Sequence, residues 1–146
     1  SLGTPENKMS KSEPDGCVFL MDKPEDIIRK FKRAVTDSGS EVRMGEGKDG
    51  INNLITIYRA FTGKSEEEVV SEFAGRGYGD FKMAVGEACA DALAPVQAEY
   101  ARLMADKAYL EDVMKKGAEE ANYCARKTLS KVKKKIEYKS RHKLLL

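Results

Sequence analysis

Two lysines and two serines near the start of the chain have the residue types and spacing best suited to chemistry. Lys8-Met9-Ser10-Lys11-Ser12 lies in a segment rich in glycine, proline and serine, a composition typical of an irregular loop. On such a loop, lysines three residues apart can converge on one polyphosphate as compact positive charges. When the α-phosphate of ATP is attacked, negative charge builds on the departing pyrophosphate, and one positioned donor typically contributes roughly 10²–10³ in rate. The alternative is an ordinary flexible basic loop.

A second candidate site is the basic segment from Arg126 to Lys143, in which Glu137 is the only acidic residue. Helical spacing predicts one basic face and one aliphatic face, and we expect the aliphatic face to be buried. Such a basic face suits contact with RNA phosphates. A solvated helix face that binds nothing is an equally good interpretation of the residues alone. The candidates for RNA contact are Arg126, Lys127, Lys131 and Lys134.

Composition restricts the class of protein. The 146 residues fit one domain with a modest core, and the net charge of +2 is too small to indicate nucleic-acid binding by itself. Cys17, Cys89 and Cys124 are widely spaced, which predicts neither a disulfide framework nor a zinc site and favours a reducing cytoplasm. No apolar run reaches the length of a membrane span, and no signal peptide opens the chain.

Apolar residues repeat at helical spacing through most of the chain, which predicts an all-α fold: a helical bundle of four to five helices preceded by an extended loop. Capping boxes are predicted at Asp22 and Ser65, and single caps at Asp80 and Asp106. Pro95 predicts a kink or a break in its helix. The expected helices run from Lys23 to Thr36, Ile51 to Gly63, Ser65 to Gly75, Phe81 to Ala105, and from Asp106 through Ile136.

Two shorter segments allow more than one interpretation. The apolar run Gly16 to Met21 is either a short strand or a turn that covers the core. Gly75 to Asp80 contains three glycines and superficially resembles a phosphate-binding loop. Because no strand precedes it, a tight turn between helices is favoured.

The five residues Lys8–Ser12, called the pentad below, reproduce the KMSKS signature of class I aminoacyl-tRNA synthetases, and the residues around them extend the resemblance. Ser1-Leu2-Gly3-Thr4-Pro5 precedes it, and Glu13-Pro14-Asp15 follows. Further along are Gly50-Ile51-Asn52-Asn53-Leu54 and the stretch G-R-G-Y-G-D-F-K at 75–82. In this order the motifs resemble the C-terminal portion of a bacterial-type tryptophanyl-tRNA synthetase, from Ser1 to about Ile136.

The resemblance implies roles within the pentad. Lys8 and Lys11 are expected to act catalytically on the ATP phosphates, with Lys11 the more important partner of the leaving pyrophosphate. Ser10 and Ser12 are expected to shape the loop and donate hydrogen bonds, and Met9 to hold it against the body. ATP is then a substrate accompanied by Mg²⁺, with no tightly bound cofactor and no metal site in this chain.

The resemblance also implies the domain organisation. Residues 1–21 are expected to form the ATP-binding loop and a junction, and residues 22–146 a helical domain that recognises the tRNA anticodon arm. The nucleotide-binding domain of the family is missing, since the only histidine is His142 and no strand–glycine loop–helix unit opens the chain. This segment alone is therefore expected to be inactive in adenylate formation.

For the intact enzyme the resemblance implies a cytoplasmic homodimer that uses ATP, tryptophan and tRNA(Trp), without a membrane partner. Dimerisation is expected through the missing half, so the isolated segment is expected to be a monomer. One alternative is a free-standing helical RNA-binding module in which the lysine loop has no catalytic partner. Another alternative is the tyrosine-specific relative, which shares the lysine loop. The G-x-G-Y-G-D-F-K turn and the continuous helical body favour the tryptophan-specific family.

Overall fold

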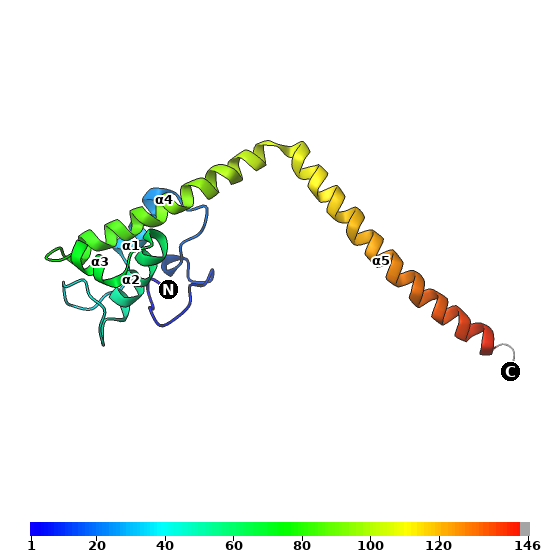
Figure 1. Ribbon diagram of the computed structural model, residues 1–146, viewed down its shortest axis with the longest axis horizontal. Coiled ribbons are helices and arrows are strands. Elements are labelled where there is room, and N and C mark those ends of the chain that lie inside the picture. Colours follow the sequence, from blue (N-terminus) through cyan, green and yellow to red (C-terminus); the bar gives the residue numbers. More distant parts are fainter. Residues whose placement is uncertain (144–146) are drawn as a thin grey trace. The chain divides into compact units, whose positions relative to one another are not determined.

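The computed structural model describes the backbone of residues 1–143 and the side chains of residues 1–136 (Figure 1). Within that range it contains five α-helices and no strand, which confirms the all-α prediction. The chain divides into two compact units, Ser1–Glu99 and Tyr100–Leu146. The leucine tail at 144–146, for which the sequence suggests no role, lies outside the described residues. The elements are η1 (Pro14–Gly16), α1 (Pro24–Lys32), α2 (Asp49–Thr62), α3 (Glu66–Glu72), α4 (Tyr78–Ala105) and α5 (Lys107–Lys143).

Helix α2 is the centre of the first unit, as its apolar circumference predicts. Ile51, Leu54 and Ile55 are fully buried, and α2 and α3 lie beside the N-terminal part of α4 (Figure 1). Three aromatic rings join these helices edge to face, with centroids 5.6 Å apart for Tyr58–Phe73, 5.8 Å for Tyr58–Phe81 and 4.8 Å for Phe73–Phe81. Such aromatic pairs typically contribute about 0.5–1.5 kcal/mol beyond their buried area.

Two helices begin with the caps that the sequence predicts. At α3, Ser65 Oγ accepts from Glu68 N at 3.2 Å and Glu68 Oε2 accepts from Ser65 N at 2.7 Å, which completes a capping box. At α5, Asp106 Oδ1 accepts from Tyr109 N at 3.0 Å. The polar side chains thus satisfy backbone N–H groups that have no partner inside the helix.

The prediction for α1 is confirmed for its first turn, which contains Pro24, but is wrong for its cap and for its C-terminal end. The N-cap is Lys23, without a side-chain cap, because the Asp22 carboxylate instead accepts from Phe19 N at 2.9 Å and Lys30 Nζ at 2.7 Å. The helix ends at Lys32 and not at Thr36. Val35 N donates to Leu2 O at 2.8 Å, so the chain leaves the helix to pair with the N-terminal segment.

Close packing of the first unit depends on two glycines. A Cβ on Gly86 of α4 would lie 2.9 Å from the Cα of Ile28 in α1, and a Cβ on Gly50 of α2 would lie 2.1 Å from the carbonyl oxygen of Val35. Both distances are too short for a side chain, so glycine permits these backbones to approach. Gly50 is part of the motif that supported the family resemblance.

Helix α4 begins three residues earlier than predicted, at Tyr78, and Asp80 is therefore in its first turn and is not its cap. The helix continues through Pro95, so the alternative of two separate pieces is wrong. Helix α3 ends at Glu72, three residues before the predicted end at Gly75, and Gly75 adopts the left-handed conformation, with a φ of 74°, in the turn that follows. The apolar segment after η1 is not a strand but contains a turn, and only its first part covers the core: Val18 packs against the core, whereas Leu20 and Met21 are 62% and 51% exposed.

The prediction of a buried aliphatic face on α5 is also wrong for the side chains that the structure describes. Val113, Leu129 and Val132 are 48%, 51% and 46% exposed. The periodicity is present, but no other helix of the second unit covers this face. The packed bundle is consequently formed by α1 to α3 and the N-terminal part of α4.

The three cysteines differ in their exposure to solvent. Cys89 is buried in the core, where desolvation raises the pKa of its thiol to about 11, whereas Cys17 is half-buried and Cys124 is exposed. All three thiols are free.

None of the helices, as far as the structure describes them, has the length and apolar character needed to cross a membrane.

Candidate functional site

The Lys8–Ser12 pentad forms an irregular exposed loop. Lys8 and Lys11 are exposed, and neither makes a side-chain hydrogen bond or ion pair with a described residue, so both ammonium groups are available to a ligand. Met9 is half-buried and packs against the hydrophobic core, as expected for an anchor. The hydroxyl oxygens of Ser10 and Ser12 are 2.7 Å apart, and Ser12 N also contacts Ser10 Oγ at 3.4 Å. The loop therefore combines a fixed apolar contact with free cations.

Backbone hydrogen bonds hold the two ends of this loop together. Leu2 N donates to Gly16 O at 3.0 Å, and Leu2 is 1% exposed. Asn53 Nδ2 on α2 donates to Ser1 O at 3.3 Å. A Cβ on Gly16 would lie 2.3 Å from Ser1 Oγ, so a side chain at this position would require the Ser1 hydroxyl to move. The loop thus leaves the core and returns to it at nearly the same point.

A partly buried ion pair that the sequence did not predict joins the end of this segment to α1. Lys30 Nζ donates to Asp22 Oδ2 at 2.7 Å and to Cys17 O at 2.8 Å, and lies 4.8 Å from the centroid of the Phe19 ring. Burial opposes ionisation of Asp22, but hydrogen bonds from Lys30 and Phe19 N hold the pKa of its carboxyl below the ordinary value. The pair fixes the chain immediately after the loop.

A second unpredicted cluster connects the segment after α1 to the start of α4. Tyr78 Oη donates to Asp37 Oδ1 at 2.9 Å, and Lys48 Nζ donates to Tyr78 Oη at 2.6 Å. Hydrogen bonding with Tyr78, together with the charge of Asp37, raises the pKa of Lys48. The tyrosine of the G-R-G-Y-G-D stretch is therefore a structural anchor, which supports the interpretation of that stretch as a turn.

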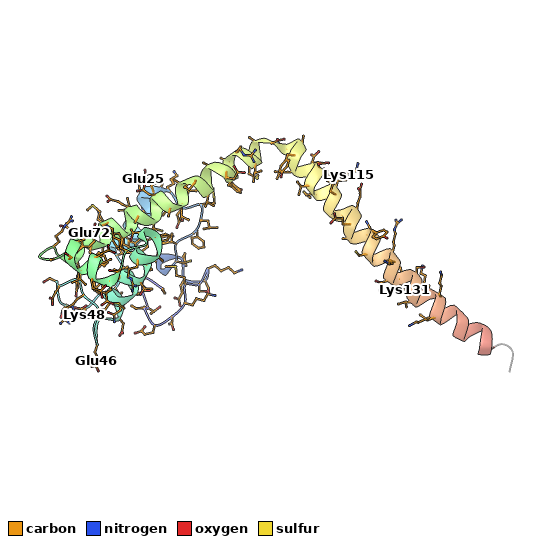
Figure 2. All side chains as sticks on the ribbon, in the orientation of Figure 1. Glu25, Glu46, Lys48, Glu72, Lys115 and Lys131 are labelled. Atoms are coloured by element: carbon orange, nitrogen blue, oxygen red, sulfur yellow. The ribbon has the colours of Figure 1, made fainter. Side chains whose placement is uncertain are left out.

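The four candidate RNA contacts lie on α5 and are exposed, and Figure 2 shows Lys131 projecting from the helix. Arg126 and Lys134 line one shallow depression, together with Lys133, which the sequence interpretation had not included. Lys127 lies one helical turn before Lys131, and its Nζ is 6.0 Å from the centroid of the Tyr123 ring. The basic face is thus broader than the four residues selected from spacing.

Comparison with known proteins identifies the family. The family described as tRNA synthetases class I (W and Y) matches residues 1–94, including the lysine loop and the packed bundle. The chain belongs to this family. The tryptophan–tRNA ligases of Wolinella succinogenes and Clostridium perfringens are each 47% identical over 137 residues, which is 92% of this chain. The match covers 42% and 41% of those two relatives, so the chain spans about two fifths of their length.

A solved structure agrees with this class I synthetase assignment. The tryptophanyl-tRNA synthetase from Mycoplasma pneumoniae superposes with a TM-score of 0.62 at 27% identity, over 69% of this chain and 34% of that one. The resemblance stated from the KMSKS loop and its flanking motifs is therefore confirmed at the level of the family. The similar proteins are tryptophan-specific by name, and the tyrosine-specific alternative finds no support among them.

Proposed function

We propose that this chain is the KMSKS-loop and helical portion of a tryptophan–tRNA ligase. In the whole protein, ATP and tryptophan would give tryptophanyl-adenylate and pyrophosphate, and the tryptophanyl group would then pass to tRNA(Trp). The observation that carries the proposal is the 47% identity to tryptophan–tRNA ligases across nearly the whole chain, together with an exposed lysine loop at the motif position. The catalytic partners of the loop would come from the remaining part of such a ligase.

Lys8 and Lys11 would stabilise the negative charge that develops on the departing pyrophosphate. Their availability supports this role, because an ammonium group already paired with a carboxylate would have to exchange partners first. Ser10 and Ser12 would maintain the loop conformation through their mutual contact. Mg²⁺ would accompany the ATP phosphates, as is general for polyphosphate substrates.

The test uses a chimera in which this chain replaces the matching segment of the Wolinella succinogenes relative. We expect tryptophan-dependent ATP–pyrophosphate exchange from the chimera. Lys11→Ala should lower kcat/KM by roughly 10²–10³, because it removes charge stabilisation that is strongest in the transition state. Lys32→Ala, which removes an equally exposed cation from α1, is the matched control and should change kcat/KM less than about twofold.

Two outcomes would contradict the proposal: a folded chimera without exchange activity, or full activity in the Lys11→Ala variant. The whole protein is further proposed to be a cytoplasmic homodimer that dimerises through the portion outside this chain. If the 146-residue chain binds tRNA but the chimera has no exchange activity, the free-standing RNA-binding module becomes the better account.

A further inference from the structure

A cavity of about 200 Å³ lies where the two ends of the lysine loop meet α1. Gly3 and Gly16, from the beginning and the end of the loop, form part of its wall. Arg29, Lys30 and Arg33 line it as well. Residues three and four apart lie on one face of a helix, which explains why these three cationic side chains reach the same space. Neither Lys8 nor Lys11 lines the cavity, so it is distinct from the candidate site at Lys8–Ser12.

The three cations differ in how far they are already neutralised. Lys30 is engaged by Asp22 and the carbonyl oxygen of Cys17. Arg29 Nη2 lies 2.6 Å from Asp26 Oδ1, but the two side chains are 57% and 36% exposed. An exposed pair of this kind typically contributes only about 0–1 kcal/mol, so Arg29 can exchange its partner at little cost.

Arg33 makes no side-chain hydrogen bond or ion pair with any residue that the structure describes, and its guanidinium donors are free. Asp15 is the one acidic side chain that lines the cavity. The cavity therefore offers two available guanidinium groups against a single carboxylate. Guanidinium is planar and carries a fork of donors that matches two oxygens of a phosphate group, which makes arginine the preferred residue for bidentate phosphate binding.

We propose that this cavity binds a phosphate group, with Arg33 and Arg29 as its ligands. The phosphate would belong either to a free polyphosphate or to an RNA backbone, since the chemistry of recognition is the same. A bound phosphate would link α1 to both ends of the lysine loop, and it would thereby fix the point from which the loop projects. This inference goes beyond the proposed ligase function and does not depend on it.

The test is an NMR titration of the 146-residue chain, labelled with ¹⁵N, at constant ionic strength. One arm uses inorganic pyrophosphate and the other a short single-stranded RNA without terminal phosphates. We expect the backbone amides of Gly3 and Gly16 and the Nε–H of Arg33 to shift in at least one arm. A response to pyrophosphate would identify a free polyphosphate as the source, and a response to RNA alone would identify the backbone phosphate.

Variants separate this site from the general positive charge of the region. Arg33→Gln should weaken binding about tenfold, because it removes a charge-assisted bidentate contact. Lys32→Gln removes the same charge from the neighbouring position of α1, outside the cavity lining, and should change affinity less than twofold. The proposal would be overturned if the signals of Gly3, Gly16 and Arg33 stay unchanged in both arms. It would also be overturned if Lys8→Gln/Lys11→Gln abolishes the shifts while Arg33→Gln leaves them intact.

Discussion

Asp22 shows at the scale of a single residue how local rules can give the wrong partner. Its position before Pro24 predicts a helix cap, and Ser65 and Asp106 in comparable positions are caps. Lys30, however, offers Asp22 a charged donor two turns into α1, at 2.7 Å. A hydrogen bond to a charged donor is stronger than one to a backbone N–H, so the carboxylate turns toward Lys30.

Replacing Asp22 with Asn should therefore lower the free energy of unfolding by about 1 kcal/mol at pH 7. The folded-state pKa of Asp22 lies below its ordinary value of 3.8. Its contribution to stability is therefore complete above that value and is lost as the pH falls through the folded-state pKa. The difference between the wild-type chain and Asp22→Asn should accordingly shrink between pH 5 and pH 2, as followed by urea unfolding.

Asp26→Asn is the matched control, because it removes a carboxylate from the exposed pair with Arg29 on the same helix. Its effect should stay below about 0.5 kcal/mol at every pH. A difference between the wild-type chain and Asp22→Asn that grows toward low pH would contradict the role given to the Asp22–Lys30 pair.

At the scale of the helices, periodicity predicted which elements exist better than it predicted their surroundings. The central position of α2 followed from its apolar circumference, the end of α2 followed from Gly63, and the start of α3 followed from the capping box at Ser65. The exposure of the aliphatic face of α5 could not be predicted from periodicity, because periodicity identifies an apolar face but does not show whether another element covers it. The end of α1 depended on a hydrogen bond between Val35 and Leu2, residues that lie far apart in the sequence.

The close approach of α1 and α4 gives a prediction at the same scale. Gly86→Ala should lower the free energy of unfolding by about 1–3 kcal/mol, since the new Cβ would meet the backbone of Ile28 at 2.9 Å and the two helices would have to separate. Gly79→Ala introduces the same methyl group into the same helix at a position with no atom within 4 Å.

We expect Gly79→Ala to be neutral or stabilising by up to about 1 kcal/mol, because alanine favours the helical backbone. Urea unfolding of both variants, followed by circular dichroism, measures the difference. Equal stability of the two variants would show that the approach of α1 to α4 is not limited by backbone contact.

At the scale of the whole molecule, the described residues contain three candidate sites, and the sequence was informative about them to different degrees. The lysine loop could be found from five consecutive residues, since its chemistry resides in a short motif. The cavity beside it could not, because Gly3, Gly16 and Arg33 come together only through the fold. The basic face of α5 was visible as a charge pattern, but the pattern does not distinguish an RNA contact from a solvated surface.

Binding to tRNA distinguishes those two interpretations of α5. If the basic face contacts the phosphate backbone, Lys127→Glu/Lys131→Glu should abolish measurable binding of the chimera to tRNA(Trp) near physiological salt. At lower salt, the slope of log affinity against log salt concentration should fall by about 2, because each lysine neutralises roughly one phosphate. Fluorescence anisotropy with labelled tRNA between about 50 and 200 mM KCl covers the range in which such slopes are resolved.

Lys115→Glu/Lys116→Glu makes the same charge change nearer the start of α5, where Figure 2 labels Lys115 and where Lys116 is paired with Asp112 at 2.7 Å. This control should retain most of the affinity and the full salt slope. If both double variants lose affinity equally, α5 attracts tRNA only through its overall charge. If neither loses affinity, the basic face is a solvated surface, and the proposed tRNA contact does not involve Lys127 or Lys131.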